Sequence, residues 1–214
     1  MEPGERRVMC LVTAVAASAG NVLEMAARHA TLASMDWIVG DAALESARTI
    51  ARGKLRAADL PYVQALGSLM IYPHGALRAE PERIRANNLG QSNLWGLALS
   101  GDYPILLMRV NGDREGLLAQ VASAHELWRR AGLPVDLVIL QNSGSAYIEP
   151  LREALLELLR EVGARDMLGR NGGLHLLFAD QGGEEQTRML EAMAWAILDD
   201  GCGPLDRQLA RAMT

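Results

Sequence analysis

The sequence predicts an α/β fold, in which an N-terminal strand and a helical segment precede a small three-layer βαβαβα unit with parallel strands. Short, nearly continuous apolar runs at 104–110, 135–141 and 174–180 are typical of parallel strands that are covered on both faces. Amphipathic stretches follow each run, and parallel strands need such crossover helices. The change of pattern near residue 100 predicts two domains, a strand plus helical linker region at 1–100 and a small α/β domain at 101–214.

The first half of the chain is predicted to form one strand and then helices. Residues 7–15, RVMCLVTAV, are apolar and rich in β-forming residues, so we expect a strand there. From Val22 onward, apolar residues recur at near-helical intervals. Pro61 suits the first turn of a further helix, with Asp59 as its cap. The run Tyr72-Pro73-His74-Gly75 should end that helix.

The helices of the second half each carry one apolar face, which suits packing on a sheet while charged residues face water. The three apolar stripes are Leu117, Val121, Ala124 and Trp128; Leu151, Leu155, Leu158 and Val162; and Leu190, Met193, Ala194 and Ile197.

Composition excludes several classes of protein. A formal charge of -5 argues against nucleic-acid binding driven by phosphate contacts. No window holds the roughly 18 consecutive apolar residues of a membrane helix, and MEPGERRVMC lacks the layout of a secretion signal. Cys10 and Cys202 are far apart, which favours two reduced thiols over a disulfide or a metal site. We therefore expect a soluble, cytoplasmic chain without direct membrane insertion.

Polar loops at the carboxyl ends of the predicted strands form one candidate site, because ligands of open α/β sheets bind there. Each loop precedes a helix whose first N–H groups could hold an anion or a sugar hydroxyl. The same residue types are also favoured as helix caps and in turns. The candidate residues are Asp113, Asn142, Ser143, Ser145 and Asp180.

Other motifs indicate no metal, cofactor or phosphate site. GRNGG at 169–173 lies before a strand, whereas a phosphate-binding loop lies between a strand and its following helix. The histidines are isolated, and His125-Glu126 lacks the second histidine of a zinc-binding helix.

The stretch GQSNLWGLALSGDYPILLMRV, residues 90–110, carries the second candidate site. Its polar and aromatic side chains could hydrogen-bond to a sugar and stack on it, and upstream arginines could meet an anionic group. In the alternative, which the residues alone favour, Trp95 packs between the helical half and the sheet, and Asp102 braces the turn into the strand at Pro104. The candidate ligand-binding residues are Arg85, Gln91, Ser92, Trp95 and Asp102.

Residues 69–110 resemble the central region of cyclic β-1,2-glucan synthases. The family's block runs through Leu-Tyr-Pro, a basic run, Gly-Gln-Ser, Leu-Trp, and Ser-Gly-Asp-x-Pro before a strand. Residues 124–141, 172–181 and 197–211 are similar to its continuation, and 11–18 resemble the last strand leaving a β-sandwich domain. The chain departs from the family pattern at Gly96-Leu97-Ala98-Leu99 and in the loop at 142–145.

The resemblance implies that this chain is related to large, multi-domain inner-membrane proteins that use UDP-glucose. In these proteins, a glycosyltransferase family 84 module is joined to modules like the glycoside hydrolase family 94 phosphorylases. The phosphorylase-type general acid belongs to an (α/α)6 barrel, which no stretch here resembles. The resemblance therefore implies a segment between catalytic modules, with no catalytic residue and no cofactor of its own. An N-terminal strand without the rest of its sheet predicts that this chain is a fragment, a split gene product or a degenerate relative of the family.

Three functions follow as hypotheses. The first is a non-catalytic linker or scaffold segment that takes part in β-glucan metabolism within a larger glycosyltransferase/phosphorylase assembly, with an inner-membrane parent protein. The second is a stand-alone carbohydrate-binding module that recognises β-glucan through the Trp95/Asp102 region. The third is a small α/β enzyme acting at the strand-end loops, which would require a perturbed pKa there. The expected partners are other domains or subunits of a glucan synthase-like protein, with β-glucan as a candidate ligand.

Overall fold

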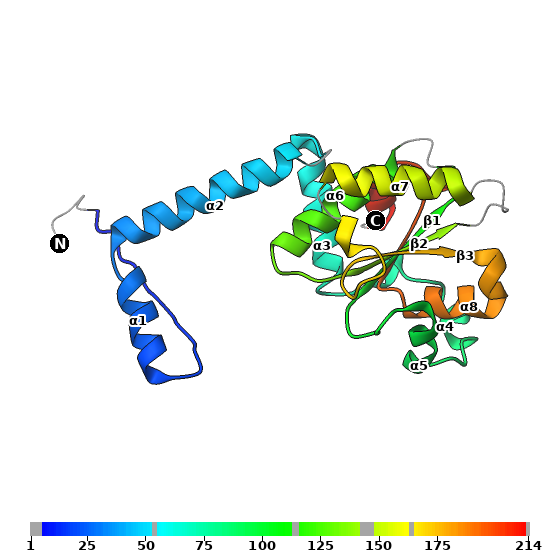
Figure 1. Ribbon diagram of the computed structural model, residues 1–214, viewed down its shortest axis with the longest axis horizontal. Helices are drawn as coiled ribbons and strands as arrows, with labels where there is room; N and C mark the ends of the chain where they lie inside the picture. Colours follow the sequence, from blue (N-terminus) through cyan, green and yellow to red (C-terminus); the bar gives the residue numbers. More distant parts are fainter. Residues whose placement is uncertain (1–5, 53–54, 113–115, 142–147, 163–164, 213–214) are drawn as a thin grey trace. The chain divides into compact units, whose positions relative to one another are not determined.

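The computed structural model describes the chain except for residues 1–5, 53–54, 113–115, 142–147, 163–164 and 213–214, and it confirms the α/β fold class (Figure 1). The chain divides into two units, Met1–Thr49 and Ile50–Thr214. The predicted boundary after residue 100 stays a prediction, although residues 50–100 belong to the same unit as the sheet.

The first unit consists of an extended segment followed by helix α1 (Ala19–His29) and most of helix α2 (Leu32–Arg52). Ser18 begins α1, because its side-chain oxygen accepts a hydrogen bond from the Asn21 N–H at 3.3 Å. The Thr31 hydroxyl accepts a similar bond from the Ser34 N–H at 3.1 Å at the start of α2. No residue of α1 is buried, so this unit has little core of its own.

The predicted N-terminal strand is wrong for the described residues, because 7–15 form no strand. A strand requires a partner for its backbone N–H and C=O groups, and the described strands pair only with one another, inside the second unit. Met9 and Leu11 are left 93% and 90% exposed, so the apolar character of this segment is not satisfied by burial in this chain.

The second unit alternates strands and helices around a four-stranded parallel sheet of order β3-β2-β1-β4. Its strands are β1 (Ile105–Val110), β2 (Asp136–Gln141), β3 (Leu174–Phe178) and β4 (Ala196–Asp199). Its α-helices are α3 (Leu60–Leu69), α4 (Pro81–Arg85), α5 (Gln91–Leu94), α6 (Leu117–Arg130), α7 (Ile148–Val162), α8 (Ala179–Met193) and α9 (Leu205–Ala212). Short 3₁₀ helices are η1 (Ala57–Asp59), η2 (Gly75–Leu77), η3 (Trp95–Leu97), η5 (Arg165–Met167) and η6 (Asp200–Cys202).

The three predicted strands are confirmed, and the sequence-based prediction missed the fourth. Ile197 was assigned to the apolar stripe of a helix, but α8 ends at Met193 and Ile197 lies in β4. The backbone decides this ending: Ala194 is extended (φ -64°, ψ 137°), and the Trp195 N–H donates to the Ile105 carbonyl of β1 at 2.8 Å. A short apolar run directly after a helix fits either continuation, so only the sheet resolves it.

Different helices cover the two faces of the sheet, which gives the three predicted layers. Leu106, Met108 and Ile139 face a large apolar cluster that includes residues of α3, α6, α7 and α9. Leu107 and Val138 face a smaller cluster formed mainly with α8 and the segment after α5. Figure 1 shows α7 on one side of the strands and α8 on the other.

The stripes predicted for α6 and α7 face this sheet where the structure describes them. On α6, Leu117, Val121, Ala124 and Trp128 are all buried. On α7, Leu155 and Leu158 are buried, whereas the side chains of Leu151 and Val162 lie outside the described residues. Leu190 of α8 is fully buried. Spacing at i, i+4, i+7 and i+11 therefore identified the buried face of α6 and the described part of the buried face of α7.

Asp59 occupies the predicted cap position before α3, with Pro61 in the first turn, but its carboxylate does not cap the helix. It accepts hydrogen bonds from the backbone N–H of Arg56 at 2.8 Å and from the Arg56 guanidinium at 2.9 Å. The hydrogen bond from the Arg56 side chain, which outweighs burial, holds the pKa of Asp59 below its ordinary value. Asp59 therefore stabilises the turn before α3 rather than the N-terminus of the helix.

Cys10 and Cys202 are both free thiols. Among the described residues, no helix is long and apolar enough to cross a membrane.

Candidate functional site

The order of the strands places a switch point between β1 and β4. The chain proceeds from β1 to β2 to β3 in one direction and then returns through α8 to β4 on the other side of β1. In open α/β sheets, ligands bind beyond the carboxyl ends of the strands at such a reversal. The polar residues near the ends of β1 and β4 are therefore the first candidates for a site.

Arg109 and Asp199 meet at this switch point. They are register partners on neighbouring parallel strands, near the carboxyl ends of β1 and β4, so their side chains lie on the same face of the sheet. Arg109 Nη1 and Asp199 Oδ2 are 3.8 Å apart. The other oxygen of Asp199 accepts a hydrogen bond from the Gly201 N–H at 2.9 Å. This is the face that α8 covers, which brings a third charged residue to the pair.

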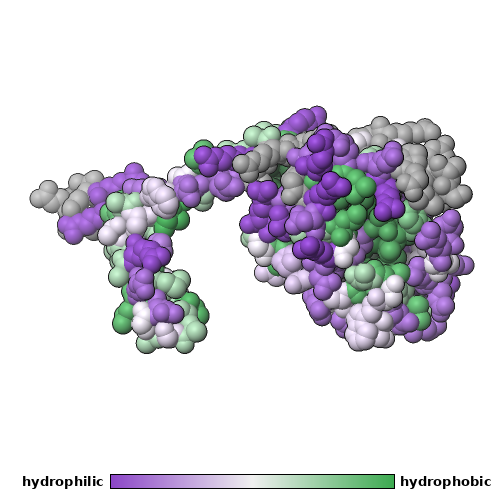
Figure 2. Space-filling model, viewed as in Figure 1, coloured by the Kyte–Doolittle hydropathy of each residue, from purple (hydrophilic) through white to green (hydrophobic). Residues whose placement is uncertain are grey.

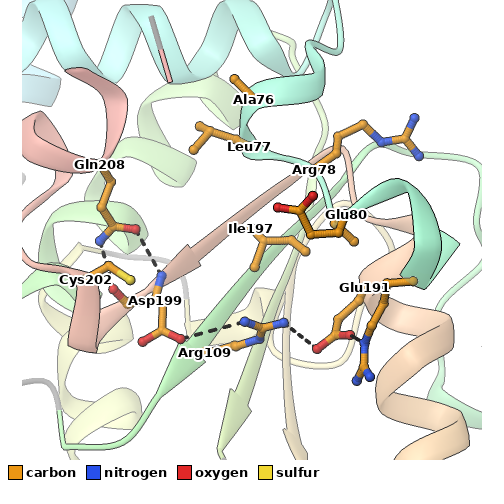
Figure 3. Close-up of a pocket in the computed structure, with 12 residues that line it drawn as sticks. Ala76, Leu77, Arg78, Glu80, Arg109, Glu191, Ile197, Asp199, Cys202 and Gln208 are labelled. Atoms are coloured by element: carbon orange, nitrogen blue, oxygen red, sulfur yellow. Dashed lines mark hydrogen bonds and ion pairs between the residues drawn. The ribbon is translucent and has the colours of Figure 1, made fainter. Parts of the chain in front are cut away.

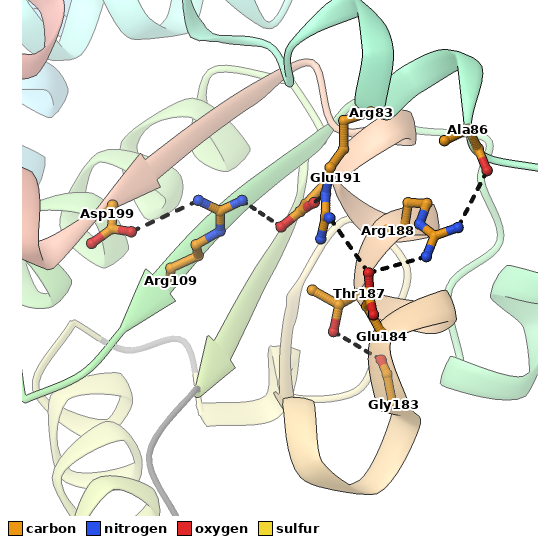
Figure 4. Close-up of polar contacts among 9 residues, drawn as sticks. All are labelled: Arg83, Ala86, Arg109, Gly183, Glu184, Thr187, Arg188, Glu191 and Asp199. Atoms are coloured by element: carbon orange, nitrogen blue, oxygen red, sulfur yellow. Dashed lines mark hydrogen bonds and ion pairs between the residues drawn. The ribbon is translucent and has the colours of Figure 1, made fainter.

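Glu191 of α8 is that residue, and its carboxylate joins three elements. Its side chain is only 4% exposed, and it accepts hydrogen bonds from Arg83 of α4 and from Arg109 of β1 (Figure 4). The bond to Glu191 raises the pKa of Arg83 above its ordinary value. A buried carboxylate is tolerated when it is paired and hydrogen-bonded in this way. We call Arg83, Arg109 and Glu191 the ionic brace.

The start of α8 continues these contacts toward α4. Glu184 accepts a hydrogen bond from Arg188 at 3.1 Å and lies 3.8 Å from Arg83 Nη1. Arg188 also donates to the Ala86 carbonyl, just after α4, at 3.5 Å (Figure 4). Helix α8 is interrupted at Gly183, whose φ of 69° favours glycine. The segment after the interruption thus holds α4 against α8.

A pocket of about 390 Å³ opens beside the ionic brace. This volume lies within the range of ~300–1,000 Å³ that is usual for small-molecule sites. Figure 3 shows Ile197 near the centre of the pocket, with Leu77 on one side and the Glu80 carboxylate on the other. The lining residues used below are Leu77, Glu80, Arg109, Glu191, Ile197 and Asp199.

The groups around this pocket differ in how far their hydrogen-bonding capacity is used. Gln208 of α9 is fully engaged, since it accepts from the Asp199 N–H at 3.1 Å and donates to the Asp199 carbonyl at 2.9 Å and to the Gly203 carbonyl at 2.6 Å. Arg78 donates to the Ala192 carbonyl at 3.1 Å. The Glu80 carboxylate, by contrast, has no partner among the described residues.

Most of the predicted strand-end residues cannot be placed. Asp113, Asn142, Ser143 and Ser145 lie outside the described residues. Asp180 lies in the first turn of α8, directly after β3. These five positions remain predictions.

In the described part of the loop after β1, the backbone N–H groups already bind a carboxylate of the chain itself. The N–H groups of Asn111 and Gly112 donate to the Asp200 carboxylate at 2.7 and 2.9 Å. The backbone donors that could have held a ligand at this position are therefore used to join the ends of β1 and β4.

The structure brings part of the second predicted site together. Gln91 Nε2 donates to the Ser100 carbonyl at 3.0 Å and lies 3.4 Å from Asp102 Oδ1. The Trp95 indole N–H donates to the same carbonyl at 3.3 Å. Trp95 is 67% exposed, so the interpretation that it packs between the helical half and the sheet is wrong. These three residues form an exposed cluster on the turn before β1, which we call the Trp95 surface.

The three arginines upstream of residues 90–110 lie in different places. Arg83 and Arg78 line the pocket, whereas Arg85 pairs with Glu82 at 2.8 Å and is 71% exposed. Ser92 is exposed on α5. The prediction missed Arg109 and Glu191, although each had a signal, because a charged residue inside an apolar strand or an apolar helix face needs a buried partner.

No protein-family model matches the chain. The chain is 31% identical over 153 residues to the cyclic beta-(1,2)-glucan synthase NdvB of Rhizobium meliloti (strain 1021), and the match covers 70% of this chain. The chain is similar to a region of a cyclic glucan synthase. It spans about 5% of the length of that relative, which is therefore a far longer protein. The match supports the resemblance that the motifs of 69–110 indicate, at the level of a related glucan synthase region.

Proposed function

We propose that this chain is a non-catalytic scaffold segment of a cyclic β-1,2-glucan synthase-like protein, and that it serves β-glucan metabolism as one part of a larger glycosyltransferase and phosphorylase assembly. The observation that carries the proposal is the match to the Rhizobium meliloti synthase, which covers most of this chain and a small part of that relative. A related region of that synthase is embedded in a much longer polypeptide. The scaffold therefore works beside other domains or subunits, in the cytoplasm and in association with an inner-membrane parent protein.

The ionic brace supports a structural role. Glu191 binds two guanidinium groups from different elements, an arrangement that fixes α4, α8 and β1 relative to one another. Both carboxylate oxygens of Glu191 are engaged by these guanidinium groups. Its chemistry is better suited to holding a surface in place than to turnover.

The first unit supports a role within a larger assembly. Its exposed large apolar side chains are Val8, Met9, Leu11, Val15, Leu23, Met25, Leu32, Trp37, Val39 and Leu44. Apolar surface of this extent on a soluble chain marks a contact with another protein surface. We propose that another domain or subunit of the synthase-like protein covers it.

Turnover assays of the purified chain test the non-catalytic part of this proposal. We expect no glucan from UDP-glucose, and no glucose 1-phosphate from linear β-1,2-glucan with phosphate. Circular dichroism on the same sample must show a folded chain. Formation of either product by this chain alone would overturn the proposal.

The Trp95 surface supports a second candidate function, recognition of β-glucan by a stand-alone carbohydrate-binding module. Its basis is the exposed indole of Trp95 beside two polar side chains, Gln91 and Asp102. An aromatic ring of this kind can stack on the apolar face of a sugar. The titration described below separates this candidate from the pocket.

A further inference from the structure

We infer that the pocket between β1, β4, α4 and η2 is a binding site for a neutral saccharide, sized for a short stretch of glucan. Four properties of the pocket lead to this ligand class: its balance of charge, its apolar floor, the groups left free to bind, and its position at the switch point of the sheet. This inference deepens the proposed function and rests on it only for the choice of glucan linkage.

The charge around the pocket excludes ions of either sign as the preferred ligand. Three arginines and three carboxylates line the pocket, so their formal charges cancel. An anion would lie beside Glu80 and Asp199, and a cation would lie beside Arg109. A neutral ligand with many hydroxyl groups avoids both penalties, because each hydroxyl can donate to a carboxylate and accept from a guanidinium. The lining residues of charge are Arg78, Arg83, Arg109, Glu80, Glu191 and Asp199.

The floor of the pocket is apolar. Leu77 and Ile197 line it together with small alanine side chains, while charged side chains form the rest of the lining (Figure 3). A pyranose ring has the same division, with C–H groups on its faces and hydroxyl groups around its edge. A ring placed on Ile197 would turn its edge toward Glu80 and Arg109. The pocket thus matches both parts of a sugar.

Three side chains retain capacity for a ligand, namely Glu80, Arg109 and Arg78, whose Nε has no hydrogen-bond partner among the described residues. The Glu80 carboxylate has no partner in the described part of the chain and points toward Ile197 (Figure 3). Arg109 makes one hydrogen bond to Glu191 and lies 3.8 Å from Asp199, which leaves guanidinium N–H groups over. Because Glu191 and Asp199 fix the position of Arg109, its free donors are held in place before a ligand arrives. Such pre-organisation lowers the entropic cost of binding.

Calorimetric titration of the full chain with linear β-1,2-gluco-oligosaccharides tests this inference. We expect saturable binding of the oligosaccharide. Inorganic phosphate and glycine, as an anion and a zwitterion of small size, should produce no comparable heat. Binding of phosphate or glycine in place of the oligosaccharide would overturn the neutral ligand class.

Two variants locate the site. Glu80→Ala removes the free carboxylate, and it should weaken binding by about tenfold or more, because a hydrogen bond to a charged group is lost. It should fold normally, since Glu80 makes no side-chain bond at the start of α4. Trp95→Ala is the matched control from the competing surface, and it should bind like the unaltered chain.

Each other pattern overturns the pocket assignment. Loss of binding in Trp95→Ala with binding kept in Glu80→Ala would move the ligand to the Trp95 surface. If both variants bind the oligosaccharide as tightly as the unaltered chain does, both locations are excluded. If the folded chain gives no heat with the oligosaccharide, the saccharide inference fails. The scaffold function is tested independently, by replacing the matched region of a glucan synthase with this chain.

Discussion

His125 shows how one buried side chain makes the stability of this chain depend on pH. The residue is 1% exposed, and its Nε2 lies 2.8 Å from the Val135 carbonyl, which joins α6 to the residue before β2. Burial is the largest influence and lowers the pKa of His125 below its ordinary value of 6.5. The sequence showed only an isolated histidine at this position. It could not predict the carbonyl partner, which comes from outside the helix.

We expect the free energy of unfolding to decrease as pH falls below about 6.5, by at most about 1.4 kcal/mol per pH unit for this residue. The folded pKa is the lower one, so the unfolded chain takes up a proton that the folded chain does not. Urea unfolding at several pH values between about 8 and 5, the range in which an ordinary histidine changes its charge, would measure the slope. His125→Gln should reduce this slope. An equal slope in the variant and in the unaltered chain would contradict this explanation.

Trp95 marks the limit of sequence reasoning for single residues. The indole was expected to pack inward, but Ala98 adopts a left-handed conformation (φ 58°, ψ 28°) that ends η3 and turns the chain toward Ser100. A positive φ is uncommon for alanine, so nothing in the sequence predicted this turn. Trp128, which lies in a regular helical stripe, was placed correctly. The burial of a side chain can be predicted from regular helical spacing, but not in an irregular turn.

At the scale of elements, the contact between α3 and α6 depends on one glycine. Gly67 of α3 lies where a methyl group would be 2.8 Å from Nε1 of Trp128. Trp128 is 5% exposed, and its indole N–H donates to the Val63 carbonyl of α3 at 3.3 Å. The ring is therefore held by packing and by a hydrogen bond, and it cannot move aside easily.

We expect Gly67→Ala to destabilise the chain by roughly 1–3 kcal/mol, because overpacking outweighs the gain of about 1 kcal/mol in helix propensity. Chemical denaturation followed by tryptophan fluorescence would measure it. Gly40→Ala in α2 is the control, since nothing lies within 4 Å of the added methyl group. That variant should keep the stability of the unaltered chain or exceed it slightly. A stabilised Gly67→Ala protein would show that Trp128 moves freely.

The elements themselves were predicted unevenly. Strands β1, β2 and β3 were recognised because a continuous apolar run between helices has few other interpretations. Strand β4 was missed because four residues after a helix carry too little pattern to separate a strand from a last helical turn. The segment at 7–15 was assigned to a strand on composition alone, although strand formation depends on a pairing partner that no local pattern reveals.

At the scale of the whole molecule, the α/β class followed from the alternation of patterns, but the pocket did not. The pocket exists because β4 returns beside β1 and brings Asp199 opposite Arg109, two residues 90 positions apart in the sequence. Glu191 and Glu80 join them from α8 and from the start of α4. Such a site depends on strand order, which the sequence indicated only in part. The motif resemblance, in contrast, needed no structure, and the Rhizobium meliloti relative supports it.

The scaffold function is tested most directly by exchanging the matched region of the Rhizobium meliloti synthase for this chain and measuring the cyclic β-(1,2)-glucan formed by cells that carry the exchanged protein. A flexible Gly/Ser segment of equal length is the control, because it can span the same positions without folding. We predict that the chain supports substantially more product than the flexible segment does, at equal protein levels. Product no higher than that of the flexible segment would contradict the account.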